Sequence, residues 1–323
     1  MQSRPPVAQR QEGSPVNRAA LWLGATRPAF LSITLLAVLL GFSHAAWRQP
    51  APASLLVVVL TLIGALLAHA AANVLNDVAD ADSGCDAANT ERVAPFTGGS
   101  RVIQQRLLSR DAMLRFGWTL LAGSAVCGLA LLVLTDLRLL GFGIGGLLLA
   151  VAYSLPPLKL MARGLGELAV ILAWLLIVAG SDFVLRRQLD PSAWLAGLPF
   201  ALQAGMILLV NQVPDRQADL SAGKRNWTVR LAANDAALPY ALLWLGSGLA
   251  VFGGWWFGAL PAGALVALTA ISIGYVAGRQ IHRWAQSPAQ LLSPIRLTLL
   301  QAHLVGALLT LGLLGEHFFR TSP

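Results

Sequence analysis

The chain has 323 residues, of which 56% are hydrophobic and 12% are charged, against about 25% charged residues in an average soluble domain. A soluble domain of this length cannot bury so much apolar surface. The composition excludes a disordered chain, a coiled coil and a nucleic-acid-binding protein, although the net charge is +8. We predict an all-α fold, a polytopic transmembrane bundle of about nine helices, because lipid cannot satisfy the open edge of a sheet.

The predicted elements, in chain order, are a polar segment and nine apolar spans. Residues 1–27 are polar and lack the pattern of a cleaved signal peptide, so we expect a cytoplasmic N-terminal tail. Apolar runs long enough to cross a bilayer as helices follow. Their expected limits are 28–47, 54–76, 113–135, 139–155, 165–184, 194–213, 237–257, 262–281 and 297–317. Residues 28–317 are expected to form one transmembrane domain, and residues 318–323 a short C-terminal tail.

The basic residues sort to one side of this arrangement. With the N-terminus in the cytoplasm, 18 of the 23 lysine and arginine residues fall on the cytoplasmic side of the alternating spans. This distribution agrees with the positive-inside rule. We expect a multi-pass protein of the inner (plasma) membrane, embedded in the lipid bilayer, with its N-terminus and the polar loops described next in the cytoplasm.

Two clusters of acidic and amide residues follow the second and the sixth span. The first cluster has the spacing i, i+3, i+4, i+7, which places its members on one helix face. These members are Asn73, Asn76, Asp77 and Asp80. Gly84 allows a turn after them, so that Asp86 can fold back toward that face.

The second cluster has the spacing i, i+4, i+8, which again defines one helix face. Its members are Asn211, Asp215 and Asp219. The predicted topology places both clusters at the cytoplasmic end of the bundle. Solvated loops do not require such a helical phase, so a shared binding site is the better interpretation.

Carboxylates facing each other across a bundle suit a hard cation. Mg²⁺ binds through one or two carboxylates together with substrate phosphates. Arg101, Lys159 and Lys224 stand near the clusters and would offset the phosphate charge. The residues therefore predict a metal–diphosphate site that faces a cavity lined by apolar helices.

The two clusters resemble the Asp-rich motifs of the UbiA family of integral-membrane prenyltransferases. Asn76-Asp77-x-x-Asp80 and Asp215-x-x-x-Asp219 match the two motifs. Further similar segments are Arg27-Pro28, Thr97-Gly-Gly-Ser-Arg101, Tyr153-Ser-Leu-Pro-Pro-Leu-Lys159, Gly164-Leu-Gly-Glu167 and Asp219-x-x-x-Gly223-Lys224. An aspartate two residues after Gly84 is similar to the menaquinone-type branch, which prenylates 1,4-dihydroxy-2-naphthoate.

This resemblance implies a polyprenyl diphosphate donor, an aromatic acceptor and Mg²⁺. The implied metal ligands are Asp77, Asp80, Asp86, Asp215 and Asp219. The implied diphosphate-binding residues are Asn73, Asn76, Arg101, Asn211 and Lys224. The implied catalytic residues are Asp77, Asp80, Asp215, Asp219, Lys159 and Tyr153. The metals would assist ionisation of the allylic C–O bond, and the acceptor carbon would then attack.

Several assignments stay open at this stage. Tyr153 either faces the allylic cation or the acceptor, or packs at an interface. Glu167 either lines the site or stabilises a helix N-terminus. Cys85 has no feature of a nucleophile, and the five histidines are expected to be packing or interface residues.

The acceptor is also open, with Pro214 and Gln217 departing from the menaquinone-type pattern. The alternatives are 4-hydroxybenzoate, homogentisate, chlorophyllide or a lipid alcohol. A membrane transporter is the alternative of another class, although transporter sites favour the bilayer midplane.

Overall fold

The computed structural model describes residues 17–49 and 54–321. Residues 1–16 of the predicted tail and residues 322–323 lie outside this range. The described residues form helices and connecting segments without a strand, which confirms the predicted fold class.

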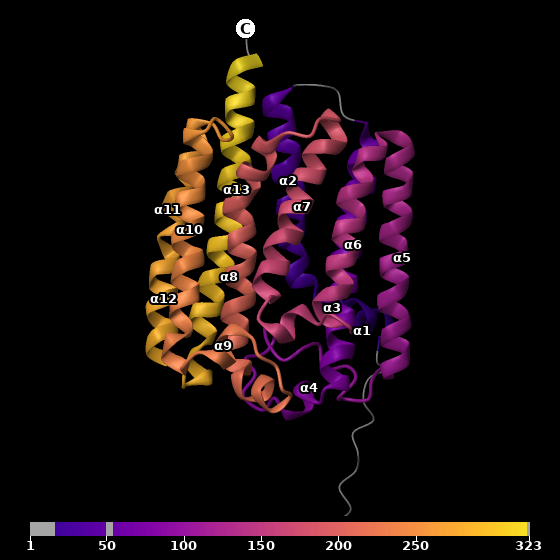
Figure 1. Cartoon of the computed structure of the whole chain (residues 1–323), viewed down its shortest axis with the longest axis vertical. Coiled ribbons are helices and arrows are strands. Elements are labelled where there is room, and N and C mark those ends of the chain that lie inside the picture. Colours follow the sequence, from indigo (N-terminus) through magenta and orange to yellow (C-terminus); the bar gives the residue numbers. More distant parts are fainter. Residues whose placement is uncertain (1–16, 50–53, 322–323) are drawn as a thin grey trace, which may run out of the picture.

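Nine helical segments in the described part of the chain are long and apolar enough to cross a membrane, as predicted. The helices of these segments are α2 (Pro28–Arg48), α3 (Leu55–Asp82), α5 (Arg110–Leu134), α6 (Leu140–Ser154), α7 (Gly166–Arg186), α8 (Pro191–Ser221), α10 (Ala237–Trp256), α11 (Ala267–Ile271) with α12 (Ile273–Trp284), and α13 (Leu292–Thr321). They stand roughly side by side along the long axis of the molecule (Figure 1).

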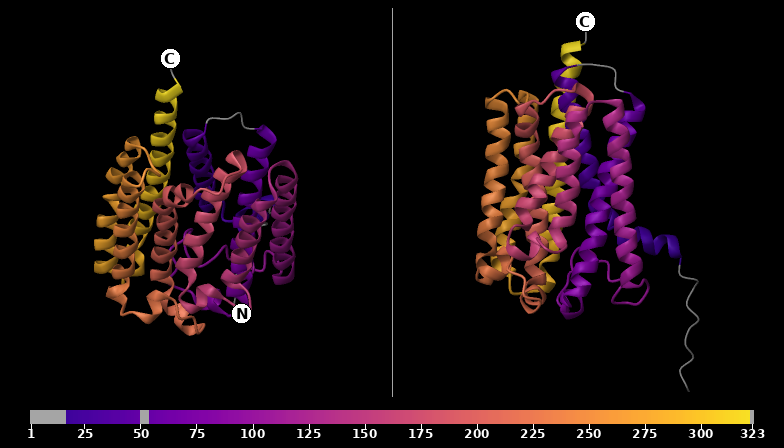
Figure 2. Two further views of the ribbon diagram at one scale, coloured as in Figure 1. Left: turned by 45° about the horizontal axis from the view of Figure 1, so that its top comes forward. Right: turned by 45° about the vertical axis from the view of Figure 1, so that its right-hand side comes forward.

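Helix α8 lies at the centre of the bundle. It packs against α7, α10, α13 and α2, and Phe200 and Leu209 on α8 are fully buried. The C-terminal helices α10 to α13 stand on one side of α8, and α5 and α6 stand on the other side (Figures 1 and 2). The bundle therefore has two halves that meet along α2, α7 and α8.

The short helices gather at one end of the bundle. Helices α1 (Arg18–Ala25), α4 (Cys85–Ala88) and α9 (Trp227–Arg230) lie at the lower end in Figure 1, whereas the C-terminus lies at the upper end. Both α3 and α8 also end there, so the two predicted polar clusters occupy the same end of the bundle.

Helices α3 and α8 continue further than the apolar runs at 54–76 and 194–213. Helix α3 extends to Asp82, and α8 passes through Pro214 and extends to Ser221. Hydropathy ends a span where polar residues begin, but the helix continues because its backbone hydrogen bonds do not depend on side-chain polarity. These extra turns hold Asp77, Asp80 and Asp219 on helical faces, as their spacing predicted.

The end opposite to α4 and α9 contains a buried ionic network. Asp182 on α7 is 1% exposed. Its Oδ1 lies 2.8 Å from Nδ1 of His44 and accepts a hydrogen bond from Nε of Arg186 at 2.9 Å. The Arg186 guanidinium also donates to Asp190 at 2.7 Å. The network joins α2, α7 and the start of α8.

Asp182→Ala is expected to lower the free energy of unfolding by about 3 kcal/mol, because it leaves Arg186 and His44 buried without this carboxylate. The measurement is unfolding in mixed detergent micelles. Asp136→Ala is the control, since the Asp136–Arg138 pair is exposed and contributes little. Equal effects of the two substitutions would contradict the assigned role of the network.

Candidate active site

A cavity of about 490 Å³ runs into the bundle from the end that carries α4 and α9. Both predicted clusters line its entrance. The polar lining residues include Asn73, Asn76, Asp80, Asp86, Asn211, Asp215, Asp219 and Lys224. Helix α3 and helix α8 supply most of these side chains from opposite sides, with Asp86 from α4 and Lys224 from the segment after α8. Residues more than 130 positions apart in sequence therefore share one site.

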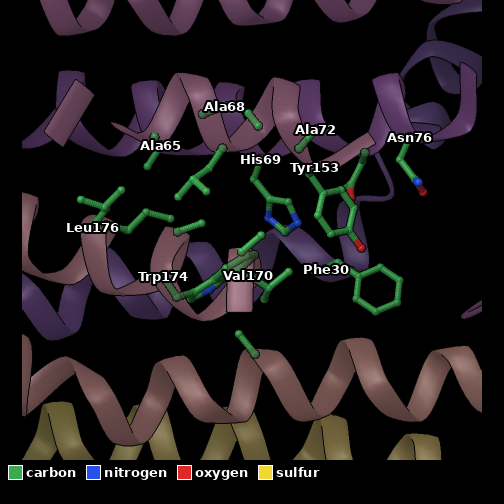
Figure 3. Close-up of a pocket in the computed structure, with 18 of the residues that line it drawn as sticks. Phe30, Ala65, Ala68, His69, Ala72, Asn76, Tyr153, Val170, Trp174 and Leu176 are labelled. Carbon is green, nitrogen blue, oxygen red and sulfur yellow. The ribbon is translucent and has the colours of Figure 1, made fainter. Parts of the chain in front are cut away.

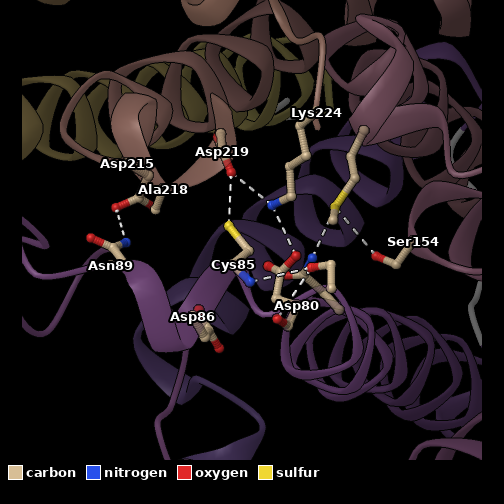
Figure 4. Close-up of polar contacts among 12 residues, drawn as sticks. Asp80, Cys85, Asp86, Asn89, Ser154, Asp215, Ala218, Asp219 and Lys224 are labelled. Atoms are coloured by element: carbon tan, nitrogen blue, oxygen red, sulfur yellow. Dashed lines mark hydrogen bonds and ion pairs between the residues drawn. The ribbon is translucent and has the colours of Figure 1, made fainter. Parts of the chain in front are cut away.

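Lys224 connects the two clusters. Its Nζ lies 2.9 Å from Oδ1 of Asp80 and 2.8 Å from Oδ1 of Asp219 (Figure 4). Burial alone would lower the pKa of Lys224, but the charges of Asp80 and Asp219 outweigh burial and raise this pKa well above its ordinary value. The ammonium group therefore stays charged and neutralises part of the negative charge between the clusters.

Asp77 is held by the start of α2. The guanidinium of Arg27 donates to Oδ1 of Asp77 and, at 3.3 Å, to Oδ1 of Asn76. The backbone N–H of Ser100 donates to Oδ2 of Asp77 at 3.1 Å. Burial alone would lower the pKa of Arg27, but Asp77 raises it above its ordinary value, so this guanidinium is a fixed positive charge beside the first cluster.

The carboxylates of the second cluster have neutral partners as well. Asn89 donates to Oδ1 of Asp215 at 2.7 Å, and the backbone N–H of Gly98 donates to Oδ2 at 3.3 Å. Asn226 donates to Oδ2 of Asp219 at 2.7 Å. These donors orient the carboxylates toward the cavity.

Asp86 folds back toward the first cluster, as expected from the turn at Gly84, whose φ is 74°. Its Oδ2 accepts from Gln104 at 3.1 Å, and its backbone carbonyl accepts from the guanidinium of Arg101. Burial, together with the charges of Asp80 and Asp77, raises the pKa of Asp86 to about 7. This carboxyl therefore ionises only near neutral pH in the metal-free protein.

Metal-free protein is expected to lose stability as the pH rises from 3.8 to about 7. The folded state binds more protons than the unfolded state in this window, because the folded pKa of Asp86 is the higher one. The loss is on the order of 4 kcal/mol at most. Asp86→Asn should flatten this dependence when unfolding is followed in the presence of a chelator. An unchanged slope in Asp86→Asn would show that another group causes it.

The inner part of the cavity is apolar. Its lining includes Ala65 and Leu176. Figure 3 shows the rings of Phe30 and Tyr153 nearest to Asn76 and the polar entrance, with His69, Val170 and Trp174 between them and Leu176. The small side chains leave space along α3, and the cavity reaches Thr61, 19 residues before Asp80 on the same helix, or about 28 Å along the helix axis. This shape suits a ligand with a polar head at the entrance and a longer apolar chain in the interior.

The model of the UbiA prenyltransferase family matches residues 29–300. The chain belongs to the UbiA prenyltransferase family. It is therefore a prenyltransferase, and the nine apolar helices among its described residues make it a multi-pass membrane protein.

Relatives within the UbiA family support this assignment. The 1,4-dihydroxy-2-naphthoate octaprenyltransferase of Escherichia coli K12 is 30% identical over 72% of this chain and 75% of its own length. The enzyme of the same name from Haemophilus influenzae is 28% identical over 69% of this chain and 73% of its own length. UbiA prenyltransferase domain-containing protein 1 of Dictyostelium discoideum is 28% identical over 73% of this chain and 72% of its own length.

Solved structures of UbiA homologs share the fold. One from Archaeoglobus fulgidus, bound to DMAPP and Mg²⁺, gives a TM-score of 0.63 at 17% identity and covers 88% of this chain and 99% of its own. An apo structure from Aeropyrum pernix gives 0.64 at 17% identity, covering 86% and 97%.

Most of the residues expected from the UbiA motifs meet at the cavity. Tyr153 lines it, whereas Asp77 and Arg101 lie behind the lining. Asp77 accepts from Arg27, and Arg101 donates to the backbone carbonyl of Asp86; both Arg27 and Asp86 line the cavity. Lys159 is exposed and does not line the cavity, so its catalytic assignment remains a prediction without support from this placement.

Other lining residues were not expected from the sequence. Arg27, Asn89 and Asn226 donate hydrogen bonds to Asp77, Asp215 and Asp219, respectively. In the sequence, only their position near a motif could have indicated this role. His69, expected to be a packing residue, lines the cavity. Glu167 is buried without a hydrogen-bond partner for either carboxylate oxygen, and does not line the cavity.

The residues at the entrance fit Mg²⁺. In the part of the chain that the structure describes, no three His, Cys, Asp or Glu groups converge on one point, so substrate oxygens would have to complete the coordination. Oδ1 of Asn211 is buried without a hydrogen-bond partner. Oδ1 of Asp80 forms an ion pair with Lys224 at 2.9 Å and has no further partner, so this oxygen can accept one more ligand.

Gly99 also leaves space at this point. A Cβ there would lie 2.7 Å from Oδ2 of Asp86 and 3.1 Å from Oδ1 of Asp77, and its φ of 71° disfavours any side chain. A glycine therefore keeps the gap between these two carboxylates open.

Proposed function

We propose that this chain transfers a polyprenyl group from its diphosphate to 1,4-dihydroxy-2-naphthoate, a step of menaquinone biosynthesis. The observation that carries the proposal is the meeting of two Asp-bearing helix ends around Lys224 at the entrance of an otherwise apolar cavity. The entrance suits the diphosphate, and the interior suits the prenyl chain. Octaprenyltransferases for this acceptor are among the most similar relatives.

The diphosphate is proposed to bind between α3 and α8. Asp77, Asp80 and Asp86 would hold Mg²⁺ from one side, and Asp215 and Asp219 from the other. The metal would neutralise the diphosphate charge and stabilise it as a leaving group. The amides of Asn73, Asn76 and Asn211 and the charges of Lys224 and Arg101 would orient the phosphate oxygens.

The apolar interior has two proposed roles. It would hold the prenyl chain along α3, and it would keep water from the allylic cation until the acceptor attacks. Tyr153 stands at the boundary between the polar entrance and this interior (Figure 3). From this position its ring would contact either the cation or the acceptor.

The proposed function is tested with purified protein, a polyprenyl diphosphate, Mg²⁺ and a panel of acceptors. The panel contains 1,4-dihydroxy-2-naphthoate, 4-hydroxybenzoate, homogentisate, chlorophyllide and a lipid alcohol. We expect product with the first of these. Prenylation of another acceptor in its place would overturn the proposed acceptor and leave the enzyme class intact.

The site is proposed to face the cytoplasm across the inner (plasma) membrane. Cys85 and Cys127 are buried, so a new surface cysteine reports its own side. Phe257→Cys, between α10 and α11, should react with an impermeant maleimide on intact cells, because Phe257 is 73% exposed at the end opposite to the site. Ser287→Cys, between α12 and α13, should react only after permeabilisation. The reverse pattern would invert the orientation.

A further inference from the structure

His69 lies where the polar entrance meets the apolar interior. It stands on α3 one turn before Asn73, and therefore continues the Asn/Asp face of that helix into the membrane. Figure 3 shows its ring between Tyr153 and Trp174, pointing into the cavity. The proposed diphosphate site uses the turns that follow His69, but nothing in that site uses the imidazole.

The imidazole is held on one side only. Nδ1 lies 2.7 Å from the hydroxyl of Thr34 on α2, and the ring packs edge-on against Trp174 with 5.0 Å between centroids. Nε2 has no hydrogen-bond partner among the described residues. If Nδ1–H donates to Thr34, the lone pair of Nε2 is directed at whatever occupies the cavity.

The position along α3 matches the size of the two substrates. His69 precedes Asp80 by 11 residues, or about 16 Å along the helix axis. That length accommodates a diphosphate, the reacting allylic carbon and one aromatic ring in series. An acceptor ring beyond the allylic carbon would lie beside His69, Tyr153 and Trp174.

We propose that His69 is a catalytic residue whose Nε2 accepts the hydroxyl proton of the aromatic acceptor. This inference rests on the proposed function, because it requires a phenolic acceptor in the cavity. It assigns the acceptor ring to the part of the cavity that His69, Tyr153 and Trp174 face. A carboxylate would be a poorer choice for the base at this depth, because the carboxylates of the entrance bind cations.

The step balances without an added reactant. The allylic C–O bond breaks and its electron pair leaves with the diphosphate, and the ring carbon then attacks the allylic cation and forms the new C–C bond. The hydroxyl proton passes to Nε2 of His69, which leaves the ring as its keto form. The attacked carbon then loses its hydrogen as a proton to the departed diphosphate, or its carboxylate as CO₂, and the ring oxygen regains the proton from His69.

His69→Gln tests the proposal because glutamine accepts a hydrogen bond but is not a base at neutral pH. We expect kcat to fall about 10²-fold, the lower end of the range for general-base catalysis, while KM for 1,4-dihydroxy-2-naphthoate stays within about threefold. His303→Gln is the matched control, since His303 bonds Ser32 and does not line the cavity, and should leave kcat unchanged.

The two monomethyl ethers of 1,4-dihydroxy-2-naphthoate separate a catalytic role from a structural one. In the unchanged protein, one ether should react about 10²-fold more slowly than the diol, because it lacks the hydroxyl that donates its proton. In His69→Gln, the diol should lose this advantage over that ether. If His69→Gln fails to fold, Thr34→Val keeps the imidazole without its Nδ1 partner, and should reduce the advantage of the diol.

Equal kcat in His69→Gln and the unchanged protein, or an undiminished advantage of the diol in the folded variant, would overturn the assignment of His69. Failure of the unchanged protein to prenylate any phenol would instead overturn the proposed function. The two failures are therefore distinguishable in the same set of assays.

Discussion

Asp215→Asn is expected to lower the rate of Mg²⁺-dependent prenyl transfer by about 10³-fold, which corresponds to about 4 kcal/mol of lost transition-state stabilisation. Asparagine keeps the shape of the side chain and removes its negative charge. The side-chain amide of Asn89 and the backbone N–H of Gly98 donate to this carboxylate at 2.7 and 3.3 Å. The substitution therefore removes the charge of a group that is fixed in place at the entrance. The measurement is product formation at saturating diphosphate over a range of Mg²⁺ concentrations.

Asp82→Asn is the matched control for this experiment. Asp82 ends the same helix as Asp77 and Asp80, but its side chain is 48% exposed and pairs with Arg110 on the surface. Its loss should leave the rate close to that of the unchanged protein. Full Mg²⁺-dependent activity in Asp215→Asn would refute the proposed metal site, and an equal loss in Asp82→Asn would show that net charge, not position, is responsible.

Helical phase explains why so much of the site could be predicted from the sequence. Asn73, Asn76, Asp77 and Asp80 share a face whenever the segment is helical, and the structure confirms a helix to Asp82. The sorting of basic residues predicted that the second motif lies at the same end. Neither inference needed the packing of the helices to be known.

Contacts between distant segments could not be predicted in this way. Lys159 and Lys224 both follow a span and both stand near a motif, yet only Lys224 enters the cavity. Lys159 has a φ of 45° in an exposed turn before the 3₁₀ segment Leu160–Arg163. The direction of a side chain from such a turn depends on the local backbone and not on its distance in sequence from a motif.

Arg27 and His69 were missed for a related reason. Arg27 matched only a family entry segment, and its contact with Asp77 requires α2 to start beside the middle of the polar face of α3. His69 is in helical phase with Asn73, but its sequence neighbours are alanine and leucine, and it has no His, Cys, Asp or Glu at i+4. Without knowledge of the cavity beside it, a single polar residue in an apolar span is interpreted as a residue that packs between helices.

The two lysines of the chain give a second experiment with a large expected effect. Lys224→Met leaves Asp80 and Asp219 buried without the ammonium group between them, since their exposed fractions are 8% and 4%. We expect the metal-free protein to lose about 3 kcal/mol of unfolding free energy, as on breaking a buried ion pair. Because a divalent cation can replace the missing charge, Mg²⁺ alone should stabilise Lys224→Met more than the unchanged protein.

The same variant should lose about 10²-fold in kcat, because one positively charged donor to the leaving diphosphate is missing. Lys159→Met is the control, since Lys159 is exposed and outside the cavity, and should change neither quantity. A large activity loss in Lys159→Met would support the role expected from the sequence and show that its turn moves toward the site. Unchanged stability and kcat in Lys224→Met would show that the ammonium between Asp80 and Asp219 has no part in holding either the carboxylates or the substrate.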